Sequence, residues 1–385
     1  EDEGFGKSVS VNGDRVLVGS FEDPSRGDKA GAAHIFIMDS SLMGWTRVAT
    51  LRTNDTQAYD YFGWTVSLGN NFALIGAWQN DGAGNNAGAA YFFQKVSDYY
   101  KDGKEEWVLH TKIYGWEQDD SFGMSVALGN DRIAAIGAPG GSTVDGDHGS
   151  GYVSVFRYNG YTWAETDVIE AADGGAGHFF GMTIALEPTT NMLAVSAYGH
   201  GLYGNKNVGQ VYVYDISGMG NPIEVQTLKA HDAAGSDEFG RSVSILGDLI
   251  AVGATGDDDS GQSSGSVYLF KYGGAGGLSS QWVQKQKLMP EDDCTFCYFG
   301  AQIAMTNDTL AIGLHGGSQV PGTVWTYKKT KYDDFEFLYV LNSTDSVNGD
   351  QFGSSIAIDS NYLVVGALTS NGYDYETGAV YVYSK

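Results

Sequence analysis

The chain has 385 residues, of which 42% are hydrophobic and 13% aromatic, and its formal net charge is −25. This charge disfavours nucleic acid and anionic membranes as partners, because both require clustered Lys and Arg side chains. No stretch approaches the length of a transmembrane helix, so we expect no membrane insertion.

A Phe-Gly pair marks the start of a unit that occurs seven times. Each unit spans about 60 residues, and this self-similarity predicts a repeat architecture forming one domain over residues 1–385. The pairs begin at Phe5, Phe62, Phe122, Phe180, Phe239, Phe299 and Phe352.

Four strands are expected in each unit. The first follows Phe-Gly and alternates apolar with polar residues, as in 64–68, whereas the second is apolar throughout, as in 73–77. The third is aromatic and β-branched, as in 89–93. The fourth usually opens with Trp and closes with Leu or Ile, as in 45–51. We therefore predict an all-β protein, a seven-bladed β-propeller of four-stranded antiparallel blades.

The seventh unit ends after its third strand, so only six fourth strands are expected in this sequence. Two interpretations remain open. A strand preceding Glu1 completes the last blade, or the edge at residues 379–383 is free to accept a strand donor or a neighbouring subunit.

These units resemble FG-GAP repeats, the blades of the integrin α-subunit propeller and of many secreted or surface propellers. Phe-Gly is present in all seven units, and Gly-Ala-Pro is complete at Gly137-Ala138-Pro139 and shortened to Gly-Ala at Gly76, Gly253 and Gly366. The resemblance covers essentially the whole chain. It implies a secreted or cell-surface binding and adhesion module. Its protein or glycan ligand would meet the face formed by the loops between strands two and three and between strand four and the next blade.

Many integrin blades also carry a Ca²⁺ loop between their first two strands. The corresponding segments here, such as 11–14 and 68–71, are too short to surround a cation with six or more oxygens. We therefore expect plain hairpin turns at these positions and no integrin-type calcium sites.

Acidic residues recur in the ligand-face loops. At periodic positions, such as Asp60, Asp120 and Asp237, a carboxylate that caps its own turn is the favoured interpretation. Non-periodic acidic residues are the candidates for a cation site, and their oxygen ligands would favour Ca²⁺. They are Asp145, Asp147, Asp257, Asp258 and Asp259.

The residue after Gly-Ala, or after its equivalent, is aromatic or His in four units. These candidate ligand-binding residues are Phe21, Trp78, Tyr198 and His315. Two interpretations are open: they form an aromatic ring that stacks on a sugar or grips a partner side chain, or each fills the inner end of its own blade.

Cys294 and Cys297, the two cysteines, lie in one loop, where a local disulfide is favoured over free thiols or zinc ligation. Glycosylation sequons begin at Asn54, Asn307 and Asn342, all in expected loops, and they favour a secreted glycoprotein. The first residue is Glu1 rather than Met, as expected of a mature or trimmed product.

No metalloprotease, serine-hydrolase or phosphate-loop motif is present, so we predict a binding protein rather than an enzyme. Two alternatives remain. One is a structural subunit of an extracellular filament or coat, assembled through the seventh blade. The other is a glycan-acting hydrolase with two carboxylates over the central channel.

Overall fold

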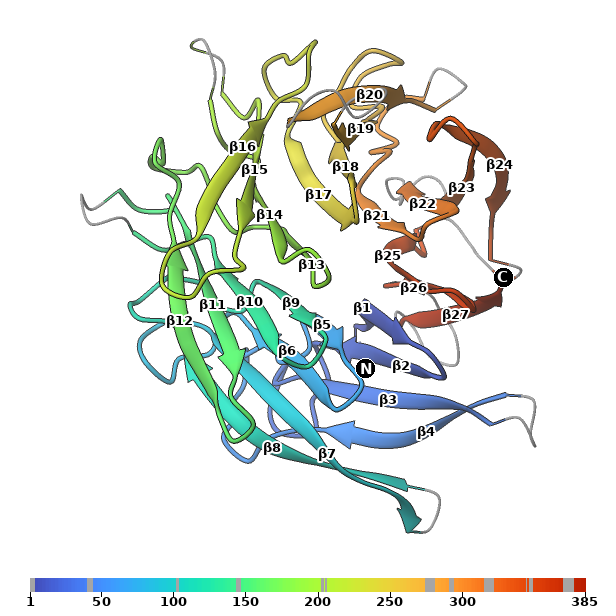
Figure 1. Ribbon diagram of the computed structural model, residues 1–385. Helices are drawn as coiled ribbons and strands as arrows, with labels where there is room; N and C mark the ends of the chain where they lie inside the picture. Colours follow the sequence, from blue (N-terminus) through green and yellow to red (C-terminus); the bar gives the residue numbers. More distant parts are fainter. Residues whose placement is uncertain are drawn as a thin grey trace.

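The computed structural model describes residues 4–385 except 40–43, 102–103, 143–146, 202–203, 205, 274–280, 291–293, 315–321, 344, 346–348 and 370–376. The described residues form 27 strands and no helix, and thus no helix that could span a membrane. The strands form seven separate sheets arranged around a central axis, which confirms the predicted β-propeller (Figure 1).

Six of the sheets have four antiparallel strands in chain order. Blades 1 to 3 consist of β1 (Phe5–Asn12), β2 (Arg15–Ser20), β3 (Ala32–Asp39), β4 (Gly44–Leu51), β5 (Thr65–Leu68), β6 (Phe72–Ala77), β7 (Ala89–Lys101), β8 (Lys104–Tyr114), β9 (Ser125–Gly129), β10 (Ile133–Ala138), β11 (Tyr152–Tyr158) and β12 (Trp163–Ile169). Blades 4 to 6 consist of β13 (Ile184–Glu187), β14 (Met192–Ala197), β15 (Gln210–Asp215), β16 (Ile223–Leu228), β17 (Phe239–Leu246), β18 (Leu249–Ala254), β19 (Ser266–Tyr272), β20 (Trp282–Leu288), β21 (Gln302–Met305), β22 (Thr309–Leu314), β23 (Thr323–Lys329) and β24 (Phe335–Leu341).

Blade 7 has three strands, β25 (Phe352–Ile358), β26 (Tyr362–Ala367) and β27 (Ala379–Ser384). Its strands β25 and β26 pack against β1, so the last blade lies beside the first and the ring is closed (Figure 1). Strand β27 is half-exposed along most of its length, whereas the third strand of blade 5 is buried over Ser266–Phe270. The difference arises because no fourth strand of the described chain covers β27.

The recurring glycines are explained by backbone geometry. The glycine of Phe-Gly has a positive φ in every unit, for example +86° at Gly6 and +92° at Gly63. The glycine of Gly-Ala lies against the next blade, because a Cβ on Gly76 would stand 2.0 Å from the carbonyl oxygen of Gly123. Only glycine meets both requirements without strain, and this fixes the spacing between blades.

A hydroxyl two residues after Phe-Gly joins most blades to the next. Ser8 Oγ donates a hydrogen bond to the carbonyl of Gly63 at 3.0 Å. Equivalent hydrogen bonds to the Phe-Gly glycine of the next blade are donated by Thr65, Ser125, Ser242 and Ser355. Blade 4 departs from the pattern: it has Ser196 where the others have the Gly of Gly-Ala, and its Thr183 donates to Arg241 instead.

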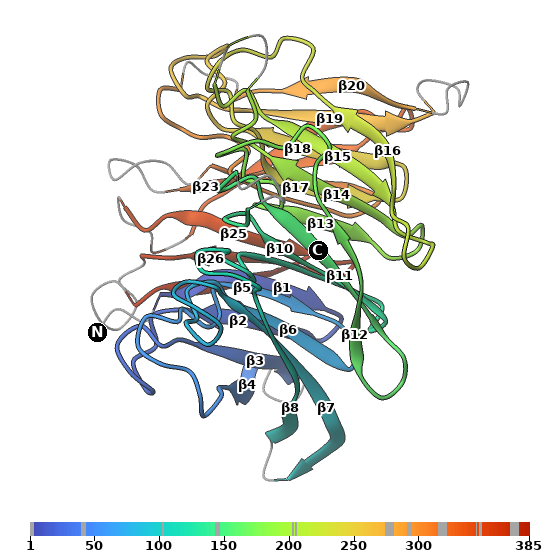
Figure 2. The same cartoon turned by 90° about the vertical axis from the view of Figure 1, so that its left-hand side faces the viewer.

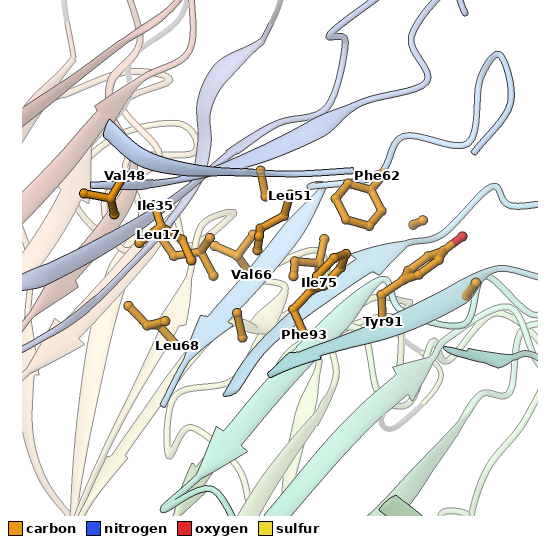
Figure 3. Packing of buried hydrophobic residues seen from close by; sticks show 14 residues of the cluster. Leu17, Ile35, Val48, Leu51, Phe62, Val66, Leu68, Ile75, Tyr91 and Phe93 are labelled. Carbon is orange, nitrogen blue, oxygen red and sulfur yellow. The ribbon is translucent and has the colours of Figure 1, made fainter. Parts of the chain in front are cut away.

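The core lies between the blades rather than within one sheet. Phe62 is fully buried and packs with Leu17 and Ile35 of blade 1 and with Ile75 and Tyr91 of blade 2 (Figure 3). Burying side chains of this size contributes about 1.5–3 kcal/mol each, so repeated seams of this kind hold the ring rigid. The long hairpin β7–β8 projects beyond the other blades (Figure 2).

Candidate functional site

The main cavity of the described chain lies in the central channel and has a volume of about 640 Å³. Each blade contributes the residue that follows Phe-Gly. A β-bulge after the Phe shifts the register of β1, β17 and β25, and bulges of this kind re-aim side chains. The seven residues are Lys7, Trp64, Met124, Met182, Arg241, Ala301 and Ser354.

Two cations enter this cavity from blades 1 and 5. Lys7 Nζ lies 4.2 Å from the centre of the Trp64 ring, and the Arg241 guanidinium lies 5.1 Å from the centre of the Tyr198 ring. Burial and the charge of Arg241 lower the pKa of Lys7 to about 8. Among the described residues, no carboxylate forms an ion pair with either cation. Glu238 also faces the cavity, and its carboxylate accepts a hydrogen bond from Thr255 Oγ1 at 3.1 Å.

Trp64, which lies against Lys7, belongs to a cluster of aromatic side chains at the mouth of the channel. Phe21 meets Trp64 edge-on at 5.1 Å, Trp64 meets Trp78 at 5.6 Å, and Trp78 stacks on Tyr61 at 5.9 Å, all between ring centres. All four rings are half-buried. They form one cluster at the boundary of blades 1 and 2, which we call the aromatic wall.

The structure thus brings two of the four predicted ligand residues together, Phe21 and Trp78. Tyr198 lies elsewhere on the mouth, stacked on Phe179 at 5.6 Å and next to Arg241. His315 lies outside the described residues. Lys7, Trp64 and Arg241 were not predicted as site residues. Their shared place after Phe-Gly is the signal that could have found them.

The periodic carboxylates cap their own turns, as favoured. Asp60 accepts a hydrogen bond from the backbone N–H of Gln57 at 2.8 Å, and Asp237 accepts one from Ala234 at 2.6 Å. Asp120 accepts bonds from Trp116 and Glu117, both at 2.9 Å.

The candidate cation residues are only partly brought together. Asp257 and Asp259, with Asp232, place carboxylate oxygens within 4.8 Å of one another. The ammonium group of Lys287 lies among them, 2.9, 2.6 and 2.8 Å from Asp257, Asp259 and Asp232. A charged side chain of the protein itself therefore occupies the position between these carboxylates and offsets part of their negative charge.

Asp258 and Asp147 do not join this group. Asp258 accepts the backbone N–H of Ser263 at 2.6 Å, Asp147 is exposed on another loop, and Asp145 lies outside the described residues.

A cluster of histidines in blade 4 was not expected from the sequence. The rings of His178 and His200 are 4.2 Å apart, and His200 Nε2 lies 3.3 Å from Asp173. Tyr212 donates a hydrogen bond to the same carboxylate at 2.6 Å. Burial and the neighbouring His200 lower the pKa of His178, so this ring is neutral near pH 7.

Cys294 and Cys297 are disulfide-bonded in the structure. The sequon residues Asn54, Asn307 and Asn342 are all exposed. The turns between first and second strands are short hairpins, as expected: Asn12 pairs directly with Arg15, and Gly13 between them has a φ of +62°.

The fold and this site define a rigid seven-bladed propeller with a mixed aromatic and cationic channel mouth. A family model described as the FG-GAP repeat matches residues 1–36, 45–93, 116–156, 163–214, 223–270 and 340–383, which is more than half of the chain. The chain therefore belongs to the FG-GAP repeat family.

The crystal structure of Sqt1 from Saccharomyces cerevisiae is similar to this fold, with a TM-score of 0.53. The two share 12% sequence identity over 100% of this chain and 85% of Sqt1, and a likeness at this identity shows the fold alone. No curated protein matches the chain.

Proposed function

We propose that the protein is an extracellular or cell-surface binding module that recognises a protein or glycan partner. The partner meets the face formed by the loops between strands two and three and between strand four and the next blade. The observation that carries this proposal is the cavity at the channel mouth, where Trp64 of the aromatic wall lies against Lys7 and where Arg241 lines the same cavity. Ligand sites combine apolar rings and a few polar groups in this way.

The experiment is partner capture from cell surfaces and on a glycan array, with the wild type and two variants. Trp78→Ala removes a ring of the aromatic wall, and Tyr332→Ala is the matched control, since Tyr332 is 69% exposed in the β23–β24 connection on the opposite face. We expect Trp78→Ala to weaken capture at least tenfold and Tyr332→Ala to leave it unchanged. Equal losses, or a loss only in Tyr332→Ala, would contradict the proposal.

We also propose that binding occurs without turnover, which separates this function from a glycan hydrolase. Captured glycans are incubated with the protein and analysed by mass spectrometry for cleaved products.

Secretion is tested by expression through a eukaryotic secretory pathway, where we expect glycans on Asn54, Asn307 and Asn342, the three exposed sequon residues. Hydrolysis products, or unmodified sequons together with retention in the cell, would count against these two points.

A second candidate function is assembly through blade 7, and two observations favour it. The outer edge of β27 has no neighbouring strand among the described residues. Beside it, blade 6 exposes Phe337, Leu338 and Tyr339 on β24, and Leu338, Tyr339 and Tyr383 line a groove of about 220 Å³. Unpaired strand edges of this kind accept a strand from another chain.

Sedimentation of the protein over a concentration series tests this assembly. A synthetic peptide of β20, residues 282–288, serves as a soluble competitor because it has the Trp-to-Leu pattern of the fourth strands. We expect concentration-dependent association that the peptide suppresses and that a scrambled peptide leaves unchanged. A monomer at all concentrations would eliminate self-assembly.

A further inference from the structure

The charges inside the channel mouth are opposite in sign to those of the whole protein. The chain has a net charge of −25, yet the charged residues that line the cavity are Lys7, Arg241 and Glu238. Exposed carboxylates, such as Asp119 and Asp258, lie in the loops of the surrounding face. An incoming ligand therefore meets an acidic rim and then a basic interior.

Neither cation forms an ion pair with a carboxylate of the described residues, although Glu238 lines the same cavity. The flat face of Trp64 supports Lys7, and the ring of Tyr198 supports Arg241. Such contacts orient a cation but leave most of its N–H groups available. A desolvated cation without an anion is costly, and the lowered pKa of Lys7 is consistent with that cost. An anion bound between the two would relieve it.

We propose that the channel mouth binds the carboxylate of an acidic sugar at the tip of a glycan, between Lys7 Nζ and the Arg241 guanidinium. This assignment rests on the function proposed above and specifies its ligand. The cavity of about 640 Å³ is within the usual range of ligand sites and holds a few sugar rings. Charge-assisted hydrogen bonds from Lys and Arg to a carboxylate are about twice as strong as those between neutral groups.

The surroundings favour a single terminal carboxylate over a polyanion. A chain with a charge on every residue would bring several anions against the acidic rim, whereas a glycan with one acidic end group places its only charge in the basic interior. The negative long-range field of the protein would repel a polyanion strongly and a glycan with one acidic end group only weakly.

The wall of the cavity favours a sugar over an acidic peptide. On one side Trp64 belongs to the aromatic wall, which suits the C–H face of a sugar ring. On other sides Gln302, Gln351 and Ser354 present amide and hydroxyl groups that can pair with sugar hydroxyls. A sugar combines both kinds of surface within one ring.

Calorimetric titration of the full chain tests the assignment. The probes are an oligosaccharide that ends in glucuronic acid, the same oligosaccharide ending in glucose, and a peptide with a terminal Asp. We expect the acid-ended oligosaccharide to bind at least tenfold more tightly than the other two. Lys7→Met and Arg241→Gln should each weaken its binding by about 10- to 100-fold, the value of one charge-assisted bond. Lys331→Met is the matched control, because Lys331 also lies over an aromatic ring, 4.9 Å from that of Tyr332, but on the opposite face.

A pH series separates a direct role of Lys7 from a structural one. Wild-type affinity should fall between pH 7 and pH 9, since Lys7 has a pKa of about 8 and loses its charge over this range. Lys7→Arg should keep its affinity at pH 9. The other charged or titratable groups facing the cavity are Arg241 on β17, Glu238 before it and Tyr298 before β21. All three are unchanged in this variant.

Equal binding of the acidic and neutral oligosaccharides, preference for the peptide, no binding of the acidic probe at millimolar concentration, or unaltered affinity in both Lys7→Met and Arg241→Gln would each overturn the assignment. The broader proposal would survive these results if partner capture still depended on Trp78. It would fall if capture were indifferent to that face.

Discussion

Ser355 Oγ donates a hydrogen bond of 2.7 Å to the carbonyl of Gly6, 349 residues away in the sequence. This buried bond is the counterpart of the one from Ser8 to Gly63 between blades 1 and 2. The seam between the last and first blades is therefore built like a seam between consecutive blades. No chain connection within the described residues joins these two blades. The ring is held shut by packing and by hydrogen bonds, among them one from the backbone N–H of Phe5 to the carbonyl of Thr377 at 3.2 Å.

Removing this hydroxyl should destabilise the closed ring. We expect Ser355→Ala to lower the free energy of unfolding by about 1 kcal/mol, the value of a typical buried hydrogen bond. Urea titration followed by tryptophan fluorescence measures it. Ser8→Ala is the matched control, with an expected loss of similar size. If Ser8→Ala is costly and Ser355→Ala is neutral, the closing seam is not formed in solution.

The glycine of Phe-Gly should be the position least tolerant of a side chain. In Gly63→Ala the new Cβ would lie 2.3 Å from the carbonyl oxygen of Ala32, at a φ of +92°. We expect a loss of more than about 3 kcal/mol, or failure to fold, because backbone strain and a backbone clash combine. Gly247→Ala also has a positive φ, +58°, but no atom within 4 Å of the new Cβ.

Gly247→Ala should therefore cost only about 1–2 kcal/mol, which is the price of the left-handed conformation alone. Thermal unfolding of the two variants compares them. Equal costs would show that the approach between blades is not what selects glycine at Gly63.

Asp237 should make stability depend on pH between about 4 and 6. Burial, opposed by the bond from Ala234 and reinforced by the charge of Asp257, raises its pKa to about 6. The unfolded value is about 3.9, so the folded state binds this proton more tightly. The stabilisation of the folded state by this bound proton is fully present below pH 3.9 and is lost as the pH rises through 6.

Asp237→Asn removes this titration. We expect the variant to gain stability relative to the wild type as the pH rises from 4 to 7, measured by urea unfolding at each pH. Asp308→Asn is the control of opposite sign. Hydrogen bonds from Thr306 and Lys385 lower the pKa of Asp308 to about 2. Its contribution is present above pH 3.9, so Asp308→Asn should lose stability at pH 7. If the difference in unfolding free energy between Asp237→Asn and the wild type did not change with pH, the raised pKa of Asp237 would be refuted.

Lys287 should act as the built-in cation of the Asp232, Asp257 and Asp259 cluster. Lys287→Met leaves three carboxylates facing one another, and we expect a loss of about 1–3 kcal/mol at pH 7. The emptied position has oxygen ligands only, so Ca²⁺ should restore part of the lost thermal stability. Differential scanning calorimetry with and without Ca²⁺ measures both effects. Stabilisation of the wild type by Ca²⁺, abolished in Asp259→Asn, would show that the ion displaces Lys287.

Most of the fold could be predicted because the same pattern of four strands recurs in the seven units of the sequence. The strands expected at 45–51, 64–68 and 73–77 are β4, β5 and β6, each within one residue of the predicted bounds. The third strand of blade 2 was expected at 89–93 but continues to Lys101 as β7. The extension pairs with β8 in a projecting hairpin. Strands in such a hairpin need no buried face, so their sequence lacks the alternation of apolar and polar residues that predicts a strand.

The site was harder to predict than the fold because it is made by ring closure. Lys7 and Arg241 belong to blades 1 and 5, and nothing local in either unit indicates that they share a cavity. Phe21 and Trp78 were found because they follow Gly-Ala or its equivalent, yet they pack with Tyr61 and Trp64 instead of forming a ring around the channel. The sequence also shows no sign that Lys287 lies among the aspartates, since the contact depends on strand register.

Along the wall of the channel, positions whose residue type is fixed by contacts between blades alternate with positions whose residue type is not fixed. On one side of the inward-facing position, the glycine of Phe-Gly lies against the preceding blade. On the other side, a small hydroxyl residue in most units donates a hydrogen bond to the next blade. At the position itself, the seven units carry Lys, Trp, Met, Met, Arg, Ala and Ser. The same ring could therefore acquire a new specificity through a handful of substitutions there, with its architecture untouched.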